Sequence, residues 1–154
     1  MKWFNFSKKA SPRDWILGLC PEKAVAAEIG VWKGEFSQKI LSRNPSQLHL
    51  IDPWVQISDV PGRLHAAPQT DMDAICESVV QKFKGVSCVH IHRCFSKEAS
   101  SKLSDRSFDW VYVDANHSYE FVLQDLEAWY PRVKLGGIIA GDDYRENAAL
   151  HWGV

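Results

Sequence analysis

The stretch that most constrains the fold is residues 24–37, AVAAEIGVWKGEFS. Residues 24–29 form an apolar run broken only by Glu28, as expected of a strand covered on both faces. Gly30 and Gly34 follow it, and glycine permits the positive φ of a tight turn and a close backbone approach to a ligand. The stretch therefore predicts a strand, a tight turn and the start of a helix, with any ligand at the carboxyl end of the strand.

The spacing of this turn, ExGxxxG, narrows the choice of ligand. Dinucleotide-binding turns carry GxGxxG, whose middle glycine admits a pyrophosphate. Here the paired glycine is missing, and Glu28 adds a negative charge close to where phosphates would lie. We expect a cationic or zwitterionic ligand rather than a polyphosphate. The alternative is that the two glycines mark only a tight turn.

The rest of the chain alternates between the strand and helix patterns. Helices are expected at residues 12–20, 35–43, 71–83, 96–103 and 119–129, and strands at 24–29, 47–52, 86–91, 108–114 and 136–142. Such alternation predicts a parallel sheet with right-handed crossovers. We expect one domain over residues 1–154, with a doubly wound, Rossmann-like α/β fold of strand order 3-2-1-4-5.

Carboxylates follow three of these strands. Asp52 lies 22 residues beyond Gly30, where a nucleotide-binding fold places the acid that binds ribose hydroxyls, although Asp52 also suits the start of an Asp-Pro turn. Asp114 follows the fourth strand, and Asp142 and Asp143 follow the fifth. Unless these three acids only end their strands, their mutual repulsion favours a hard divalent cation, with Mg²⁺ preferred over iron and manganese.

These motifs resemble those of the class I S-adenosylmethionine (SAM) dependent methyltransferases, whose first motif is the acidic-x-Gly-x-x-x-Gly turn. Residues 108–144 are similar to the metal-dependent O-methyltransferases, both the catechol type and the type that acts on macrolide sugars. The resemblance implies that Asp114, Asp142 and Asp143 bind the metal. DANHSYE also resembles the DxxHxYE pattern of the second type, which implies that His117 is the general base.

The same resemblance implies which residues bind SAM. They are Glu28, Gly30, Gly34, Asp52 and, next to adenine, Ser96. The hydroxyl of Ser37 lies one residue beyond the serine of the catechol type, so its contact with the methionine end departs from that pattern. The implied reaction is metal-assisted methylation of a small-molecule hydroxyl on a sugar, phenol or natural product. Two alternatives stay open: a non-catalytic SAM-fold module and a metal-dependent hydrolase.

Charge and composition bear on partners and location. A formal net charge of -1 over 154 residues gives no electrostatic case for nucleic acid or an anionic membrane. The first residues lack the apolar core of a signal peptide, and no apolar run approaches the ~20 residues that span a bilayer. Four cysteines without a CxxC pair are typical of thiols in a reducing compartment. We therefore expect a cytoplasmic protein.

Two segments need a separate interpretation. The long connection after Asp52 has Trp54, Arg63 and His65, which are candidates for facing substrate or for ordinary loop positions. Methyltransferases of this class carry about seven strands, whereas this chain stops soon after the fifth, whose apolar edge would be unpaired. The chain is then either a short form that covers this edge as a homo-oligomer or a piece of a longer protein.

Overall fold

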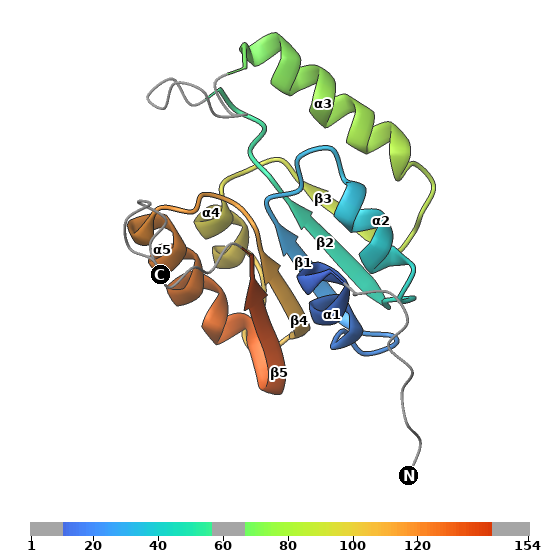
Figure 1. Cartoon of the computed structure of the whole chain (residues 1–154), viewed down its shortest axis with the longest axis vertical. Coiled ribbons are helices and arrows are strands. Elements are labelled where there is room, and N and C mark those ends of the chain that lie inside the picture. The colour runs from blue at the N-terminus through green and yellow to red at the C-terminus, as the bar shows by residue number, and fades with distance from the viewer. Residues whose placement is uncertain (1–10, 57–66, 143–154) are drawn as a thin grey trace.

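A central sheet of five parallel strands organises the protein (Figure 1). The computed structural model describes residues 11–56 and 67–142. The strands are β1 (Val25–Ile29), β2 (Gln47–Ile51), β3 (Val89–His92), β4 (Phe108–Val113) and β5 (Val133–Gly141). Their spatial order, β3-β2-β1-β4-β5, confirms the predicted α/β fold.

Helices cover both faces of the sheet. One face packs against α1 (Pro12–Gly18), α2 (Glu35–Leu41) and α3 (Gln69–Lys82), and the other against α4 (Ser96–Ser101) and α5 (Tyr119–Trp129). A short 3-10 helix, η2 (Tyr130–Arg132), leads into β5. Side chains alternate along a strand, so on β4 Trp110 and Tyr112 enter the first core, while Val111 and Val113 enter the second. This two-sided burial explains the nearly continuous apolar strands.

Several predicted element boundaries differ from those of the structure; β5, for example, begins at Val133 rather than at residue 136. The helix expected from Asp71 begins at Gln69, and Pro68 rather than Asp71 occupies the N-cap position. The third strand begins at Val89 instead of residue 86, because the preceding residues form turns: the amide of Val86 donates to the Phe83 carbonyl at 3.1 Å, and the amide of Val89 donates to the Val86 carbonyl at 3.0 Å.

The edge strand β5 contains a bulge. Val133 is paired with Phe108, and the next pair is Ile138 with Trp110. One residue of β4 therefore lies opposite residues 134–137 of β5, which bulge out of the ladder. Gly136 has a φ of +78° within this bulge, and Leu135 is 84% exposed. Regular pairing with β4 then continues to Gly141, which places Asp142 directly beyond the end of the ladder.

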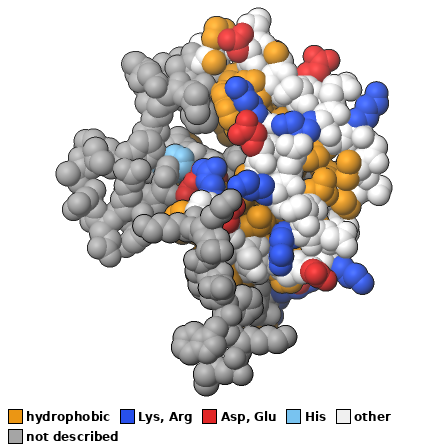
Figure 2. Space-filling view, turned by 45° about the vertical axis from the view of Figure 1, so that its right-hand side comes forward, with side chains coloured by type: hydrophobic (Ala, Val, Ile, Leu, Met, Phe, Trp, Pro, Cys, Tyr) orange, Lys and Arg blue, Asp and Glu red, His pale blue; other side chains and the backbone are white. Residues whose placement is uncertain are grey.

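The described surface mixes both signs of charge. In the space-filling view of Figure 2, Lys and Arg side chains are interspersed with Asp and Glu side chains, with hydrophobic patches between them. Among the described residues, no helix has the length and apolar character needed to cross a bilayer.

Candidate functional site

The glycine turn between β1 and α2 forms part of a cavity at the carboxyl ends of the strands. Gly30 and Gly34 both have positive φ, +90° and +70°. A Cβ on Gly30 would lie 2.1 Å from the carbonyl oxygen of Asp114, so the turn packs directly on the end of β4. A Cβ on Gly34 would lie 3.0 Å from the Phe83 ring. Gly30 lines the cavity, whereas Gly34 is not among the lining residues.

Asp52 fastens this turn to the end of β2. One carboxylate oxygen accepts hydrogen bonds from the backbone amides of Val31 and Trp32, at 3.0 and 2.9 Å. The other oxygen accepts one from the amide of Trp54, at 2.8 Å. Asp52 also lines the cavity. The carboxylate therefore shapes the cavity wall, and its contact with a ribose stays a prediction.

Trp54, a candidate for facing substrate, is instead part of the protein interior. Its side chain is completely buried, and its Nε1 donates to the Trp32 carbonyl at 2.9 Å. The indole therefore ties the loop after β2 to the glycine turn. Arg63 and His65, the other two candidates in that connection, lie outside the described residues.

Glu28 lies beneath the cavity. Its side chain is 1% exposed, and a carboxylate oxygen accepts a short hydrogen bond from the Ser37 hydroxyl on α2. Burial raises the pKa of Glu28 to about 8, with smaller contributions from the charges of Asp114 and Asp52 and against the effect of the Ser37 bond. Glu28 and Ser37 thus join β1 to α2 in the interior, and their predicted ligand contacts stay untested.

The cavity wall is completed by residues of α4 and α5. Its apolar part includes Ile29, Ile51, Val55, Met72, Phe95 and Phe121, and its polar part includes Asp52, Ser96, Asp114, Asn116, Gln124 and Asp125. The hydroxyl of Ser96 accepts a hydrogen bond from Trp129 Nε1 at 2.8 Å. Burial raises the pKa of Asp125, while a hydrogen bond with Ser96 acts in the opposite direction. Apolar walls with several carboxylates suit a ligand that has a flat aromatic part and a positive charge.

Asp125 is a cavity residue that the sequence analysis missed. The apolar spacing of Val122, Leu126 and Trp129 predicts that these three residues form the buried face of α5, but the buried positions are Asp125 and Trp129. Val122 and Leu126 are half-buried. The apolar periodicity concealed the position, because an aspartate within an amphipathic helix normally faces solvent.

The acids beyond β4 and β5 converge, as predicted, but on an arginine of α1. Arg13 Nη2 lies 2.7 Å from Asp114 Oδ2 and also forms an ion pair with Asp142 Oδ2, to which Arg13 Nε donates at 2.6 Å. The described residues hold no group of three or more His, Cys, Asp and Glu side chains arranged for a metal. The third predicted ligand, Asp143, lies outside the described residues. Arg13 therefore holds carboxylate oxygens of Asp114 and Asp142 that the predicted metal ligation would use, and that ligation stays a prediction.

His117 lies beside the first acid and lines a second cavity. Its Nε2 is 3.8 Å from Asp114 Oδ1, which is within ion-pair range but beyond a hydrogen bond. The second cavity is mostly apolar and is lined by Val113, Ala115, Asn116, His117, Val122, Leu126, Ala140, Gly141 and Asp142. Ala115 and Asn116 line both cavities. The two cavities therefore adjoin at this loop.

Comparison with known proteins agrees with the fold of the chain. A protein of Corynebacterium glutamicum has a TM-score of 0.61 and 15% identity, over 83% of this chain and 55% of that one. A SAM-dependent methyltransferase from Mesorhizobium loti has a TM-score of 0.58 and 14% identity, over 84% of this chain and 52% of that one. A putative methyltransferase from Streptococcus mutans, solved with S-adenosylhomocysteine (SAH), has a TM-score of 0.58 and 9% identity, over 84% and 68% of the two chains.

The chain covers a little over half of the first two of these structures. No curated protein matches it in sequence. The family model described as a methyltransferase domain matches residues 27–144, which run from β1 through the glycine turn to the acid that follows β5. The chain therefore belongs to the methyltransferase domain family.

Proposed function

We propose that the protein transfers a methyl group from SAM to the hydroxyl of a small molecule. The observation that carries the proposal is the pair of adjoining cavities, which share Ala115 and Asn116. The first has the glycine turn and several carboxylates, and the second has His117 in a mostly apolar wall. Methyl transfer requires a donor and an acceptor at near-contact distance, which two adjoining cavities can provide.

The first cavity has the properties that SAM requires. Its apolar side chains suit adenine, and Asp52 supplies negative charge for a sulfonium ligand. When bound, SAM supplies an electrophilic methyl carbon. The Gly30 turn would approach the ligand with its backbone, while Ser96 and Asp52 would line the adenine and ribose positions that the sequence motifs indicate.

The second cavity has the properties of an acceptor site. Val122 and Leu126 offer apolar contact to the body of a small molecule, and His117 supplies an imidazole for proton removal. Asp114, 3.8 Å from His117, favours the imidazolium that forms when the proton is taken. The aromatic or sugar character of the acceptor follows from the motif resemblance alone.

The role of His117 is tested by His117→Gln. General base catalysis contributes about 10²- to 10⁴-fold, so kcat should fall by this factor while SAM affinity stays unchanged. Turnover is followed as SAH formed in the presence of sugar, phenol and alcohol acceptors. His90→Gln, which changes an exposed histidine of β3, is the matched control and should behave as the wild type. Equal turnover in both variants would refute the assignment, and SAM binding without turnover on any acceptor would favour a binding module.

A further inference from the structure

The acids that follow β4 and β5 lie side by side at the end of the sheet. Val113 is paired with Gly141, so the next residues, Asp114 and Asp142, leave adjacent strands at the same level. Their side chains are only 14% and 18% exposed. Two carboxylates this close repel each other where solvent screening is reduced, so their arrangement requires a positive charge.

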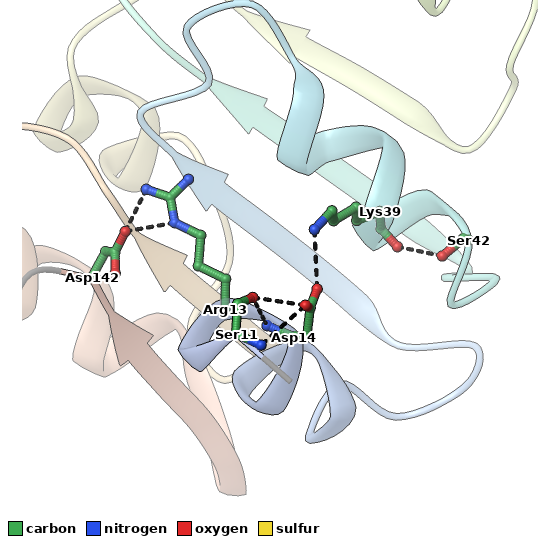
Figure 3. A network of polar contacts seen from close by, with 6 residues as sticks. All are labelled: Ser11, Arg13, Asp14, Lys39, Ser42 and Asp142. Atoms are coloured by element: carbon green, nitrogen blue, oxygen red, sulfur yellow. Dashed lines mark hydrogen bonds and ion pairs between the residues drawn. The ribbon is translucent and has the colours of Figure 1, made fainter. Parts of the chain in front are cut away.

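Arg13 supplies that charge from across the fold. Its Nη2 contacts the Oδ2 atoms of both acids, and its Nε donates to Asp142 as well. Figure 3 shows the guanidinium reaching from α1 to Asp142. Burial lowers the pKa of Arg13, but the bond to Asp142 and the charge of Asp114 outweigh this effect and raise it. The arginine is therefore a permanent cation between the two acids.

The position of Arg13 is fixed by α1. This helix begins with a capping box in which Ser11 and Asp14 bond each other's backbone amides. Asp14 also pairs with Lys39 of α2 at 3.0 Å, in the same network (Figure 3). The guanidinium of Arg13 lies 5.9 Å from the centre of the Phe36 ring. Arg13 therefore extends from a helix that is capped and held to α2, and its own side chain lies against Phe36.

A metal ion and Arg13 need the same carboxylate oxygens. Mg²⁺ binds carboxylate oxygens at about 2.0 to 2.1 Å and keeps an octahedral shell, which leaves no room for a guanidinium nitrogen on the same oxygen pair. Tyr112, next to this group, adds no charge: burial and the charges of Asp114 and Asp142 raise its pKa, so the phenol stays neutral.

We propose that Arg13 replaces a divalent cation as the counter-charge of Asp114 and Asp142, and that it positions both acids without metal. The relevance of Arg13 to methyl transfer rests on the function proposed above. The contacts of Arg13 with the two acids do not depend on that function. Arg13 is a positioning residue here, because it acts through the two acids.

The test is thermal unfolding of the full chain with EDTA or with MgCl₂. Wild-type Tm should be the same in both. Arg13→Met keeps the apolar stem but removes the charge, so in EDTA its Tm should fall by roughly 5 °C or more. The freed acid pair should then bind Mg²⁺, and a tenfold excess of Mg²⁺ over its dissociation constant should raise the Tm of Arg13→Met by about 4 °C.

Three further variants separate the counter-charge from simple packing. Lys102→Met removes the surface ion pair with Glu98 and should change Tm little, with no response to Mg²⁺. Arg13→Lys keeps the charge and should stay insensitive to Mg²⁺. In the double variant Arg13→Met with Asp142→Asn, the repulsion is gone, so part of the lost Tm should return and the Mg²⁺ response should vanish.

Either of two results would overturn the proposal. One is a rise in the Tm of the wild type or of Arg13→Lys on addition of Mg²⁺. This comparison can be made even if Arg13→Met does not fold. The other is a folded Arg13→Met protein without a Mg²⁺ response. The Tm measurement does not involve SAH. If the variants show the predicted Mg²⁺ responses but the protein binds no SAH, the proposed function is refuted and the role of Arg13 is not.

Discussion

Gly30 is required both by its backbone conformation and by its packing. In Gly30→Ala, the new Cβ would meet the Asp114 carbonyl oxygen at 2.1 Å at a φ of +90°. We expect a loss of more than about 3 kcal/mol in the free energy of unfolding, measured by urea denaturation. Gly85→Ala is the matched control, because Gly85 has a φ of +80° with open space around it. It should lose only about 1 to 2 kcal/mol. Equal losses would contradict the packing argument.

Glu28 makes stability depend on pH. Its folded pKa of about 8 exceeds the ordinary value of 4.5, so between these values the folded state holds a proton that the unfolded state has lost. This contribution is complete below pH 4.5 and is lost as the pH rises through about 8, which lowers the free energy of unfolding by up to about 1.4 kcal/mol per pH unit.

Glu28→Gln should remove this slope, because a neutral amide takes no part in proton exchange. The measurement is urea unfolding of the wild type and of Glu28→Gln at several pH values between 4.5 and about 8. His49, whose pKa burial lowers to about 4, gives a slope of the opposite sign below its ordinary value of 6.5. Both proteins share that slope, so their difference isolates Glu28. Parallel pH profiles would show that Glu28 is ionised in the folded protein.

The position of the site residues could be predicted from their spacing, but their partners could not. Glycines after an apolar run indicated the turn at Gly30, and the acid after the second strand indicated Asp52. The local pattern carries no information on which amides Asp52 accepts from, since these depend on how the turn folds back. The local pattern also does not show that the Glu28 side chain is buried and accepts from Ser37, and its ligand contact stays a prediction.

The strands were predictable because two-sided burial imposes apolar runs on them. The predicted strand start was wrong before β3, where apolar residues belong to a turn. The predicted buried face was wrong on α5, where the polar Asp125 occupies a buried position. In both places the tertiary environment overrides the local pattern. The bulge of β5 was likewise not predicted, although Gly136 and Gly137 stand at that point.

The edge strand β5 carries a prediction on assembly. Within the described residues, β5 pairs with β4 alone, and Leu135 is 84% exposed in the bulge. We propose that this edge associates with a second copy of the chain, since an open apolar edge favours strand pairing. Leu135→Lys should then shift the protein toward monomer in sedimentation velocity runs at increasing concentration. The exposed Leu123→Lys on α5 is the control. Identical sedimentation of the wild type and both variants would exclude this edge as the contact.

Contacts between segments that are far apart in the chain could not be predicted from the sequence. Arg13 is 101 residues from Asp114 and 129 residues from Asp142, and nothing in its local surroundings predicts that it bridges them. The clustered acids in the sequence indicate a need for positive charge, for which a metal ion is the expected source. The fold brings a guanidinium to the same place, because α1 packs on the sheet and its Arg13 side chain reaches Asp114 and Asp142.

The central claim is that the cavity formed by the Gly30 turn, α4 and α5 binds SAM. Isothermal titration of SAH into the full chain tests it most directly. The account predicts one SAH per chain. Val55→Trp fills the cavity without removing a polar partner, and its affinity should be at least about tenfold weaker, a loss of about 1.4 kcal/mol. No binding heat with the wild type, or equal affinity in a folded Val55→Trp protein, would contradict the claim.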